Sequence, residues 1–353
     1  MKQSVHRLYK LQIERSTITV TPKGTILTGV KPTILFNMEN KYFSTKQKAA
    51  QIEGKKKRRA LIKATEEAAQ RAVNASVLDQ EDKIDTILSG STGIGKTWNT
   101  EKALEGLEFK PNEDYVLLQG NHSMTAFAIK LMMAHRTFTL NKKNEDETLI
   151  VMVDDCDTFF SNKDSRNILK GMTGRRGTRR LQYNKILPEH MLTDRQHAVL
   201  EHYRHTDGSP GFTISCDDVA FIFTTNFKFP TENQASAELA KNGPTNRANA
   251  LQDLAALRSR CKTKDFMLDK AINWGWIVEV ALNDGLLDML NETEDPEFSK
   301  YRLLDWVLNN WDNMTEHNLR TISDMGRMMI KYPDSYIDEW EADFVEGNTL
   351  VLL

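Results

Sequence analysis

The stretch that decides the fold is Gly90-Ser91-Thr92-Gly93-Ile94-Gly95-Lys96-Thr97. The apolar run Ile84 to Leu88 precedes it, and a helical pattern follows it from Thr97 to Leu107. Glycines let such a loop curl until its N–H groups converge on phosphate oxygens, and the N-terminus of the next helix favours an anion. We expect Lys96 to reach the β- and γ-phosphates and the Thr97 hydroxyl to bind Mg²⁺. The loop therefore predicts a site for a nucleoside triphosphate with magnesium.

A second apolar run, Leu149 to Val153, ends in the carboxylates of Asp154 and Asp155. A phosphate-loop site needs one acid to orient the magnesium shell and another to polarise the attacking water. We assign Asp154 to the metal and Asp155 to the water. In the alternative interpretation, Asp155 and Asp157 merely cap the following helix.

Apolar β runs alternate with helical patterns from about Asp82 onward, which is typical of a parallel sheet covered by helices. The expected strands are Ile84 to Leu88, Tyr115 to Gln119, Thr148 to Val153 and Val219 to Thr225, with a short further strand at Lys264 to Leu268. Beyond this point the apolar spacing of three and four predicts helices at Ile272 to Leu290, Pro296 to Trp311 and Leu319 to Lys331.

The N-terminal part, before Asp82, has a different residue pattern. Residues from about Arg7 to Phe43 favour short strands. The segment from Thr45 to Val73 is Ala-rich, lacks proline and is strongly basic, so it predicts a helix. This helix is either a solvated linker, or a contact to a phosphate backbone or another partner.

Taken together, these motifs resemble the AAA+ ATPase family: a Walker A loop, a Walker B strand, a later strand that ends in Asn, an Arg-bearing segment and a helical lid. The resemblance covers roughly Asp82 to Lys331. It implies an α/β fold with an AAA+ P-loop parallel sheet and a C-terminal α-helical lid, to which the residue pattern adds a small β-rich N-terminal unit. The expected parts are a β-rich unit at 1–44, a basic helical connector at 45–80, the nucleotide-binding domain at 81–268, and the lid with an acidic tail at 269–353.

The resemblance also implies roles for single residues. Asn226 corresponds to sensor 1, although an Asn there could be a simple turn residue. Arg260 is the first and Arg258 the second candidate for an arginine finger that completes the site of a neighbouring subunit; the alternative is a solvated helix end. Arg320 resembles sensor 2, at a position where a surface arginine of a helix start would also fall.

The family's Walker B pair is Asp-Glu, whereas this chain has Asp154-Asp155. The second side chain is one methylene shorter, so activation of water could be slower while nucleotide binding is unaffected. The neighbourhood from Asp154 to Phe160, followed by Asn167 to Lys170, resembles AAA+ proteins encoded by tailed bacteriophages.

The segment from Lys163 to Lys185 is basic and contains glycines, which suits a loop that contacts a polyanionic strand. The candidate nucleic-acid contacts are Arg175, Arg176, Arg179 and Arg180. The competing interpretation is a surface loop, or an interface that docks onto acids of the next protomer. His197, His202 and His205 lack the cysteines or carboxylates that would complete a metal site.

The 353 residues carry a net charge of -2 and three widely spaced cysteines, so neither a disulfide framework nor a CxxC metal pair is expected. No apolar run is long enough for a signal peptide or a membrane span. These features are typical of a soluble protein of the cytoplasm, or of the host cytoplasm if the chain is viral.

The sequence therefore predicts an ATPase that uses ATP and Mg²⁺ at subunit interfaces of a homo-oligomeric ring, by family analogy a hexamer. The expected role is that of a nucleic-acid-associated motor or loader in replication, recombination or packaging. A chaperone-like protein remodeller, with a protein partner at the N-terminal unit, and an ATP-gated assembly protein with slow turnover are the alternatives.

Overall fold

A computed structural model describes residues 45–78, 82–120, 123–144, 147–187 and 192–345. The β-rich unit expected at 1–44 lies outside the described residues. From Gln47 onward the chain groups into one compact unit, so the connector, the sheet and the C-terminal helices belong to the same body.

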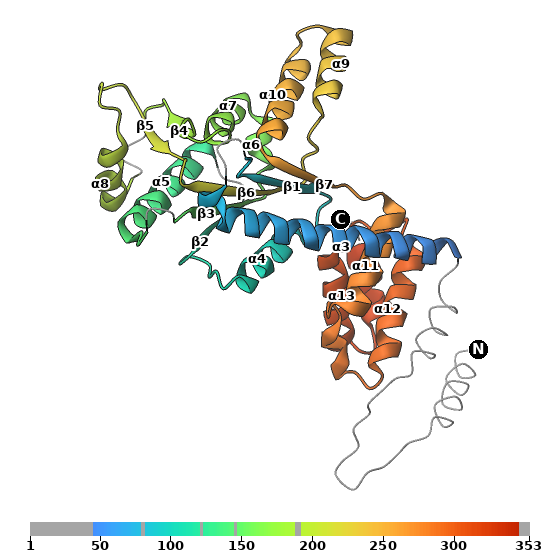
Figure 1. The fold of residues 1–353 in the computed structure, drawn as a ribbon. Helices are drawn as coiled ribbons and strands as arrows, with labels where there is room; N and C mark the ends of the chain where they lie inside the picture. The colour runs from blue at the N-terminus through green and yellow to red at the C-terminus, as the bar shows by residue number, and fades with distance from the viewer. Residues whose placement is uncertain (1–44, 79–81, 121–122, 145–146, 188–191, 346–353) are drawn as a thin grey trace, which may run out of the picture. The chain divides into compact units, whose positions relative to one another are not determined.

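The centre of this unit is a five-stranded parallel sheet in the order β2-β3-β6-β1-β7 (Figure 1). Its strands are β1 (Thr86–Gly90), β2 (Tyr115–Gln119), β3 (Leu149–Asp154), β6 (Val219–Thr225) and β7 (Lys262–Phe266). All residues of β1, β3 and β6 are buried, because helices cover both faces of a parallel sheet. The prediction of a parallel sheet flanked by helices is confirmed.

Two hydrophobic clusters lie on opposite faces of the sheet, since successive strand residues point to alternate sides. On one face, α3 (Thr45–Val73) and α4 (Lys96–Gly106) pack on Leu88, Met152 and Ile222. On the other, α5 (Met124–Asn141), α6 (Asp157–Ser161) and α7 (Lys163–Met172) pack on Val151 and Phe223.

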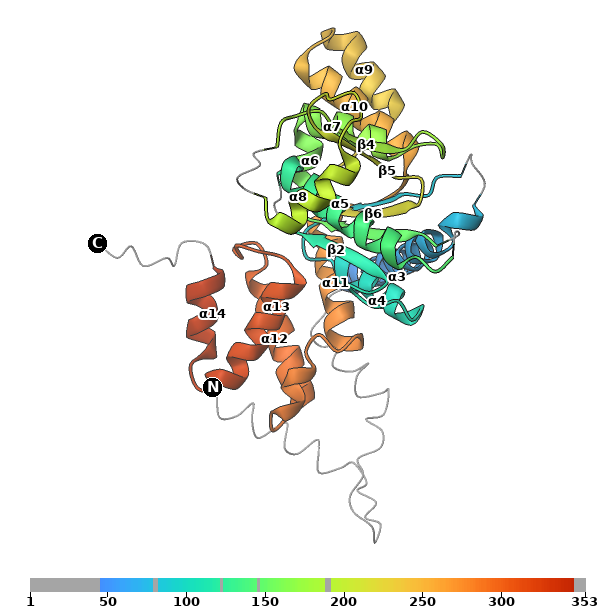
Figure 2. The same cartoon turned by 90° about the vertical axis from the view of Figure 1, so that its left-hand side faces the viewer.

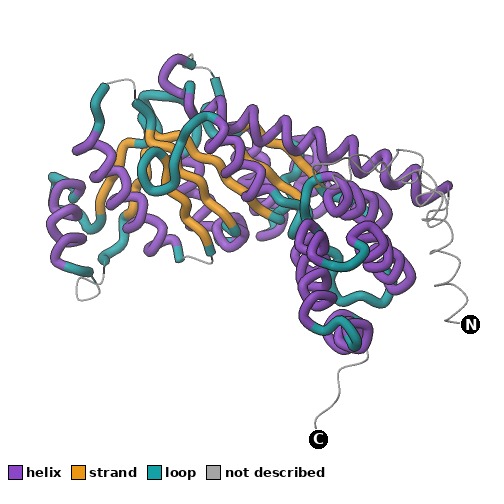
Figure 3. The backbone as a smooth tube through the Cα atoms, turned by 90° about the horizontal axis from the view of Figure 1, so that it is seen from below, coloured by secondary structure: helices purple, strands orange, loops and turns teal. Residues whose placement is uncertain are grey.

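Helix α3 is more than a solvated linker. Its residues Leu61, Ala64, Ala68, Ala69 and Ala72 are buried against the sheet. Figure 3 shows this long helix running along the sheet toward the C-terminal helices. The burial of its apolar side leaves the basic side chains on the remaining faces.

The C-terminal part is helical, as predicted. It comprises α11 (Lys270–Asn283), η3 (Asp288–Glu292), α12 (Pro296–Asn310), α13 (Leu319–Lys331) and α14 (Tyr336–Phe344), of which Figure 2 shows the α-helices as one group. The helix expected to reach Leu290 ends at Asn283, because Gly285 adopts a φ of +76° that a continuing helix excludes.

Further elements are inserted between β3 and β7. The hairpin-like pair β4 (Arg180–Tyr183) and β5 (Phe212–Ser215) is antiparallel and flanks α8 (Asp194–Tyr203), whereas α9 (Glu232–Asn242) and α10 (Asn246–Arg260) lie between β6 and β7. A 3₁₀ turn, η1 (Ala75–Val77), follows α3. The basic segment 163–185 is thus largely helix α7 and strand β4. Within the described ranges, every helix is too short or too polar to cross a lipid bilayer.

Candidate nucleotide site

The candidate site lies where β1, β3 and β6 end. Because the three strands are parallel neighbours, their carboxyl ends meet at one edge of the sheet. The glycine loop follows β1, Asp154 is the last residue of β3, and Asn226 comes directly after β6. The fold therefore places the glycine loop, Asp154 and Asn226 at the same edge of the sheet.

The glycine loop is held in a curled conformation. Gly93 and Gly95 have φ angles of +70° and +84°, a region that side chains disfavour. The Ser91 amide donates to the Phe266 carbonyl at 3.3 Å. Helix α4 then begins at Lys96, and no side chain caps its N-terminus. Its first N–H groups are thus available to an anion.

Lys96 is buried in the centre of the loop. Its Nζ donates to the Gly90 and Ser91 carbonyls at 3.0 Å and to Asn226 Oδ1 at 2.9 Å. Burial lowers the pKa of Lys96 to about 8, although nearby carboxylates, Asp154 first, oppose the shift. Lys96 therefore links the glycine loop to Asn226 at the end of β6.

Three hydrogen-bond donors converge on the carboxylate of Asp154. Its Oδ1 accepts from the Thr97 hydroxyl at 2.6 Å and also from the Thr224 hydroxyl, while Gln119 Nε2 donates to Oδ2 at 3.2 Å. The two oxygens predicted to ligate magnesium, from Thr97 and Asp154, are thus in direct contact.

These donors fit magnesium, a hard cation that binds through a few protein oxygens and otherwise through phosphates and water. Among the described residues, no group of three or more His, Cys, Asp or Glu side chains could hold a metal ion. A cation at Thr97 and Asp154 would therefore depend on oxygens of a bound triphosphate.

The sequence pattern alone does not single out Thr224 or Gln119. In the sheet register, Gln119 pairs with Asp154, and Asp154 pairs with Thr224. Their positions at the last residues of adjacent strands would have identified them, had the strand order been known.

Asp155 and Asp157 do not act as helix caps. The residue before α6 is Cys156, and no side chain caps this helix. Asp157 Oδ1 instead accepts from the Thr225 hydroxyl and from the Asn226 amide, at 3.0 Å for the latter. Asp157 thereby positions the segment that carries Asn226.

Asp155 is exposed and has a φ of +53°, a left-handed conformation that is uncommon outside glycine. Burial and the carboxylates of Asp154 and Asp157 raise the pKa of Asp155, and the cations of Lys96 and Arg320 oppose this. The charge of Arg320 therefore acts on the same site as the charge of Lys96.

The C-terminal helical part meets the glycine loop at the start of α13. Asn318 caps this helix by accepting from the Thr321 amide at 2.9 Å, and the Leu319 amide donates to the Gly93 carbonyl at 3.4 Å. Arg320 lies in the first turn and is exposed. The hydrogen bond from Leu319 thus places the residue next to Arg320 against the glycine loop, while the sensor 2 role of Arg320 stays a prediction.

The two candidates for an arginine finger, Arg258 and Arg260, differ in their hydrogen-bond partners and in their exposure. Arg258 is tied within its own chain, because it donates to Asp265 Oδ2 at 2.7 Å and to the Phe229 carbonyl at 3.0 Å. Arg260 is exposed and donates to the Lys170 carbonyl. It precedes β7, whose first residue pairs with the first residue of β1. Arg260 thus lies at the opposite end of the sheet from the glycine loop.

The predicted nucleic-acid contact of Arg179 is wrong. Its side chain is 0% exposed and binds both carboxylate oxygens of Asp85, at 2.6 and 2.8 Å. A cation enclosed in this way is neutralised and cannot reach an external phosphate. In the sequence, the signal for this buried ion pair is Asp85, a carboxylate that directly precedes the buried strand β1.

Arg176 is also directed inward. It donates to the backbone carbonyls of Ala75, Ser76 and Leu78, beyond the end of α3. Arg175 and Arg180 are exposed. Two of the four candidate arginines therefore stabilise the fold, and segment 163–185 does not form a cationic loop of the expected kind.

A comparison of the chain with models of known protein families finds no match, and neither does a comparison with curated proteins. The functional assignment therefore depends on the geometry of the site.

Proposed function

We propose that this chain binds ATP with magnesium at the glycine loop and hydrolyses it. The observation that carries the proposal is the contact of Thr97 with Asp154, beside a buried Lys96 that bonds to Asn226. A phosphate loop requires this pairing of a cation, a hydroxyl and a carboxylate around the triphosphate.

Each residue would have a distinct task. The loop amides and Lys96 would bind the β- and γ-phosphates. When the triphosphate binds, Lys96 would release the loop carbonyls and donate to phosphate oxygens instead. Thr97 and Asp154 would hold the magnesium ion, which neutralises charge on the phosphates when bound.

The hydrolytic step would use Asp155 and Asn226. Water would attack the γ-phosphorus while the bond to the bridging oxygen breaks, and Asp155 would accept the proton that the water loses. Asn226 would orient the water, and Arg320 would neutralise charge on the γ-phosphate.

The resemblance to AAA+ ATPases extends the proposal to an oligomeric ring, by analogy a hexamer, whose sites are completed by Arg260 of a neighbour. Support comes from the location of Arg260 at the end of the sheet opposite its own loop. Such a ring would serve as a motor or loader on nucleic acid, or as a chaperone-like remodeller of protein complexes.

A second candidate is an ATP-gated assembly protein with slow turnover. The observation that favours it is Asp155, whose side chain is shorter than the glutamate of the family and whose backbone is left-handed. Slow water activation would leave the ATP-bound state long-lived, so that binding rather than turnover would drive assembly.

The first test is equilibrium binding of ATP with Mg²⁺ to wild type and to Lys96→Ala. We expect the variant to lose roughly 10²-fold or more in affinity, because a buried charge-assisted contact is removed. Lys102→Ala is the matched control, since Lys102 is exposed on the same helix and stacks over Trp98, 4.1 Å from the ring centroid.

Equal affinity of wild type and Lys96→Ala would refute the proposed site. Phosphate release, measured on the same samples, separates the two candidate functions. Sustained turnover favours the ATPase, whereas tight binding with turnover slower than assembly favours the gated assembly protein.

A further inference from the structure

Helix α3 carries a row of exposed cations on a face that does not pack against the sheet. Lys56, Arg59 and Lys63 are exposed, and their spacing of three and four places them on one side of the helix. Arg59 makes no hydrogen bond or ion pair with another described residue. Lys56 pairs loosely with Glu53, at 3.6 Å.

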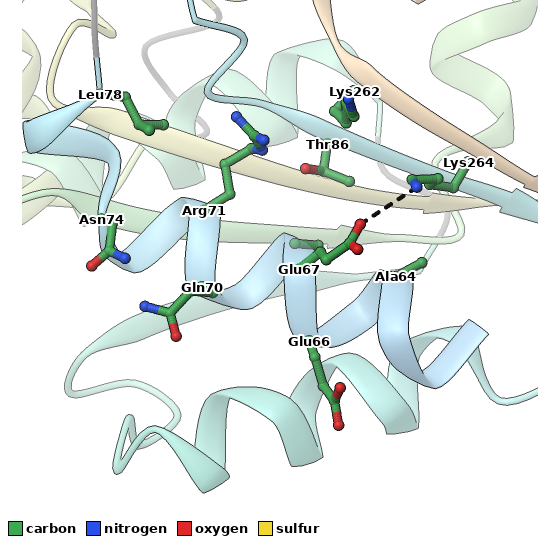
Figure 4. A pocket seen from close by; sticks show the side chains of 11 residues that line it. Ala64, Glu66, Glu67, Gln70, Arg71, Asn74, Leu78, Thr86, Lys262 and Lys264 are labelled. Carbon is green, nitrogen blue, oxygen red and sulfur yellow. Dashed lines mark ion pairs between the residues drawn. The ribbon is translucent and has the colours of Figure 1, made fainter. Parts of the chain in front are cut away.

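The same side of α3 leads into a pocket of about 780 Å³ between the helix and the sheet edge (Figure 4). Arg71 from α3 and Lys262 and Lys264 from β7 line this pocket, together with the carboxylates of Glu66 and Glu67. Arg71 also donates to the Lys83 carbonyl at 3.0 Å, in an exposed bond. Lys262 and Lys264 point to the same face of the sheet, because they are two residues apart in a strand. Three further cations thus continue the row of α3.

Glu67 links the helix to the strand. Its carboxylate lies 3.9 Å from Lys63 Nζ and 3.4 Å from Lys264 Nζ, so that it bridges the cations of the two elements. Six cations therefore form one surface, which we name the α3–β7 track: Lys56, Arg59, Lys63, Arg71, Lys262 and Lys264.

The floor of the pocket contains a buried hydroxyl. Thr86 is 3% exposed and lines the pocket, and its Oγ1 has no hydrogen-bond partner among the described residues. Lysines on an edge strand can serve merely to prevent sheet-to-sheet pairing. That role does not explain a buried hydroxyl left unpaired beneath them, which is a group that a ligand could satisfy.

We propose that the α3–β7 track binds single-stranded nucleic acid. From Lys56 to Arg71 the helix rises about 22 Å, so a row of cations of this length could follow several successive phosphates of one strand. An unpaired base or its sugar would enter the pocket and bond to Thr86 and to the amides of Gln70 and Asn74, which also line it.

This surface differs from segment 163–185, where Arg176 and Arg179 are used internally. It is also separate from the proposed nucleotide site, since Lys262 and Lys264 pair with Thr86 and Leu88, which precede the glycine loop in β1. No aromatic side chain lines the pocket, so we expect weak dependence on base sequence and strong dependence on salt.

The test is fluorescence anisotropy of the full chain with a labelled oligothymidine over a series of salt concentrations, with duplex DNA of the same length in parallel. We expect Lys262→Gln/Lys264→Gln to weaken single-strand binding at least tenfold and to reduce the salt slope by about 1.4, at roughly 0.7 per lost contact. The matched control is Lys143→Gln/Lys241→Gln, two exposed lysines in the loop after α5 and in α9, which should bind like wild type.

Two further variants test the role of the Thr86 hydroxyl and the role of the Glu67 carboxylate. Thr86→Val should weaken binding roughly two- to tenfold with an unchanged salt slope, because the lost bond is uncharged. Glu67→Gln should strengthen binding, since it removes a negative charge from the track. Lys96→Ala should bind the oligonucleotide like wild type, which separates this proposal from that of the nucleotide site.

The proposal is overturned if wild type does not bind at low salt, if the track and control variants share one affinity and slope, or if duplex DNA binds as tightly as the single strand. Circular dichroism of each variant excludes unfolding as the cause of a loss. Weakened binding by Glu67→Gln would likewise contradict the electrostatic basis of the track.

Discussion

At the scale of single residues, Asp154 is held by donors from three other elements. Thr97 comes from α4, Thr224 from β6 and Gln119 from β2. Three converging donors restrict the orientation of a carboxylate, as the outer shell of a metal ligand commonly does. The neighbouring Asp155 has no such restraint in the contacts described and is free to meet a water molecule from the solvent side.

Asp155→Asn should lower turnover of ATP by roughly 10²-fold or more while ATP affinity changes little, because a general base acts in the reaction and not in binding. Phosphate release and equilibrium binding measure the two quantities. Asp164→Asn, at an exposed carboxylate of α7, is the control. Unchanged turnover in Asp155→Asn would show that another group activates the water.

Arg179→Met should destabilise the fold by about 3–5 kcal/mol, since it leaves the Asp85 carboxylate buried without its cation. Urea unfolding measures this free energy. Arg180→Met is a matched control at the next, exposed position and should change stability by no more than about 0.5 kcal/mol. Equal stability of the two variants would contradict the structural role of Arg179.

At the scale of elements, α3 joins the sheet to the C-terminal helices. Its C-terminal half packs on the sheet, and its N-terminal half crosses α11 at Gly54 and Gly275. A Cβ on either glycine would overlap the backbone of the other helix. Lys55 and Glu279 form an ion pair of 3.0 Å beside this crossing.

Gly54→Ala should therefore lower the free energy of unfolding by about 1–3 kcal/mol, because the two helices must move apart. Hydrogen exchange of the α11 amides should accelerate in the same variant. Gly106→Ala provides the comparison, since a Cβ there meets no atom within 4 Å and alanine favours a helix. A Gly54→Ala protein as stable as Gly106→Ala would refute the close crossing.

At the scale of the whole molecule, the glycine loop and Arg260 lie at opposite ends of one sheet. A five-residue strand is about 16 Å long, so a chain cannot bring its own Arg260 to its own loop without disrupting β7. Under the proposed function, a second copy of the chain would join the two halves of the site.

Arg260→Ala should retain ATP binding and lose roughly 10³-fold in turnover. Mixing it with inactive Lys96→Ala should restore part of the activity, because an intact loop then meets an intact arginine of the neighbour. A mixture of Lys96→Ala with Asp155→Asn should stay inactive, since both defects lie within one subunit's half-site. Absence of recovery in the first mixture would argue against Arg260 in trans.

Much of the site could be predicted from local sequence. The glycines at 93 and 95 permit the loop, and apolar runs that end in Asp154 and Asn226 indicate strands with polar ends. Because parallel strands end at a common edge, the meeting of these residues follows from the strand pattern itself. The helix that carries Arg320 also begins at its predicted residue, Leu319.

Only the tertiary structure determined which charged side chains are buried in ion pairs and which are exposed. Arg179 and Asp85 are 94 residues apart, and nothing in the pattern near Arg179 distinguishes it from the exposed Arg180. Thr224 and Gln119 reach Asp154 only through the strand order, and the cations of α3 and β7 adjoin only because the helix packs beside the edge strand. Local backbone preferences act over a few residues, whereas the partner of a charge is chosen by packing between distant segments. The sequence by itself therefore determined the loop and the strand ends, and packing decided which cations face the solvent.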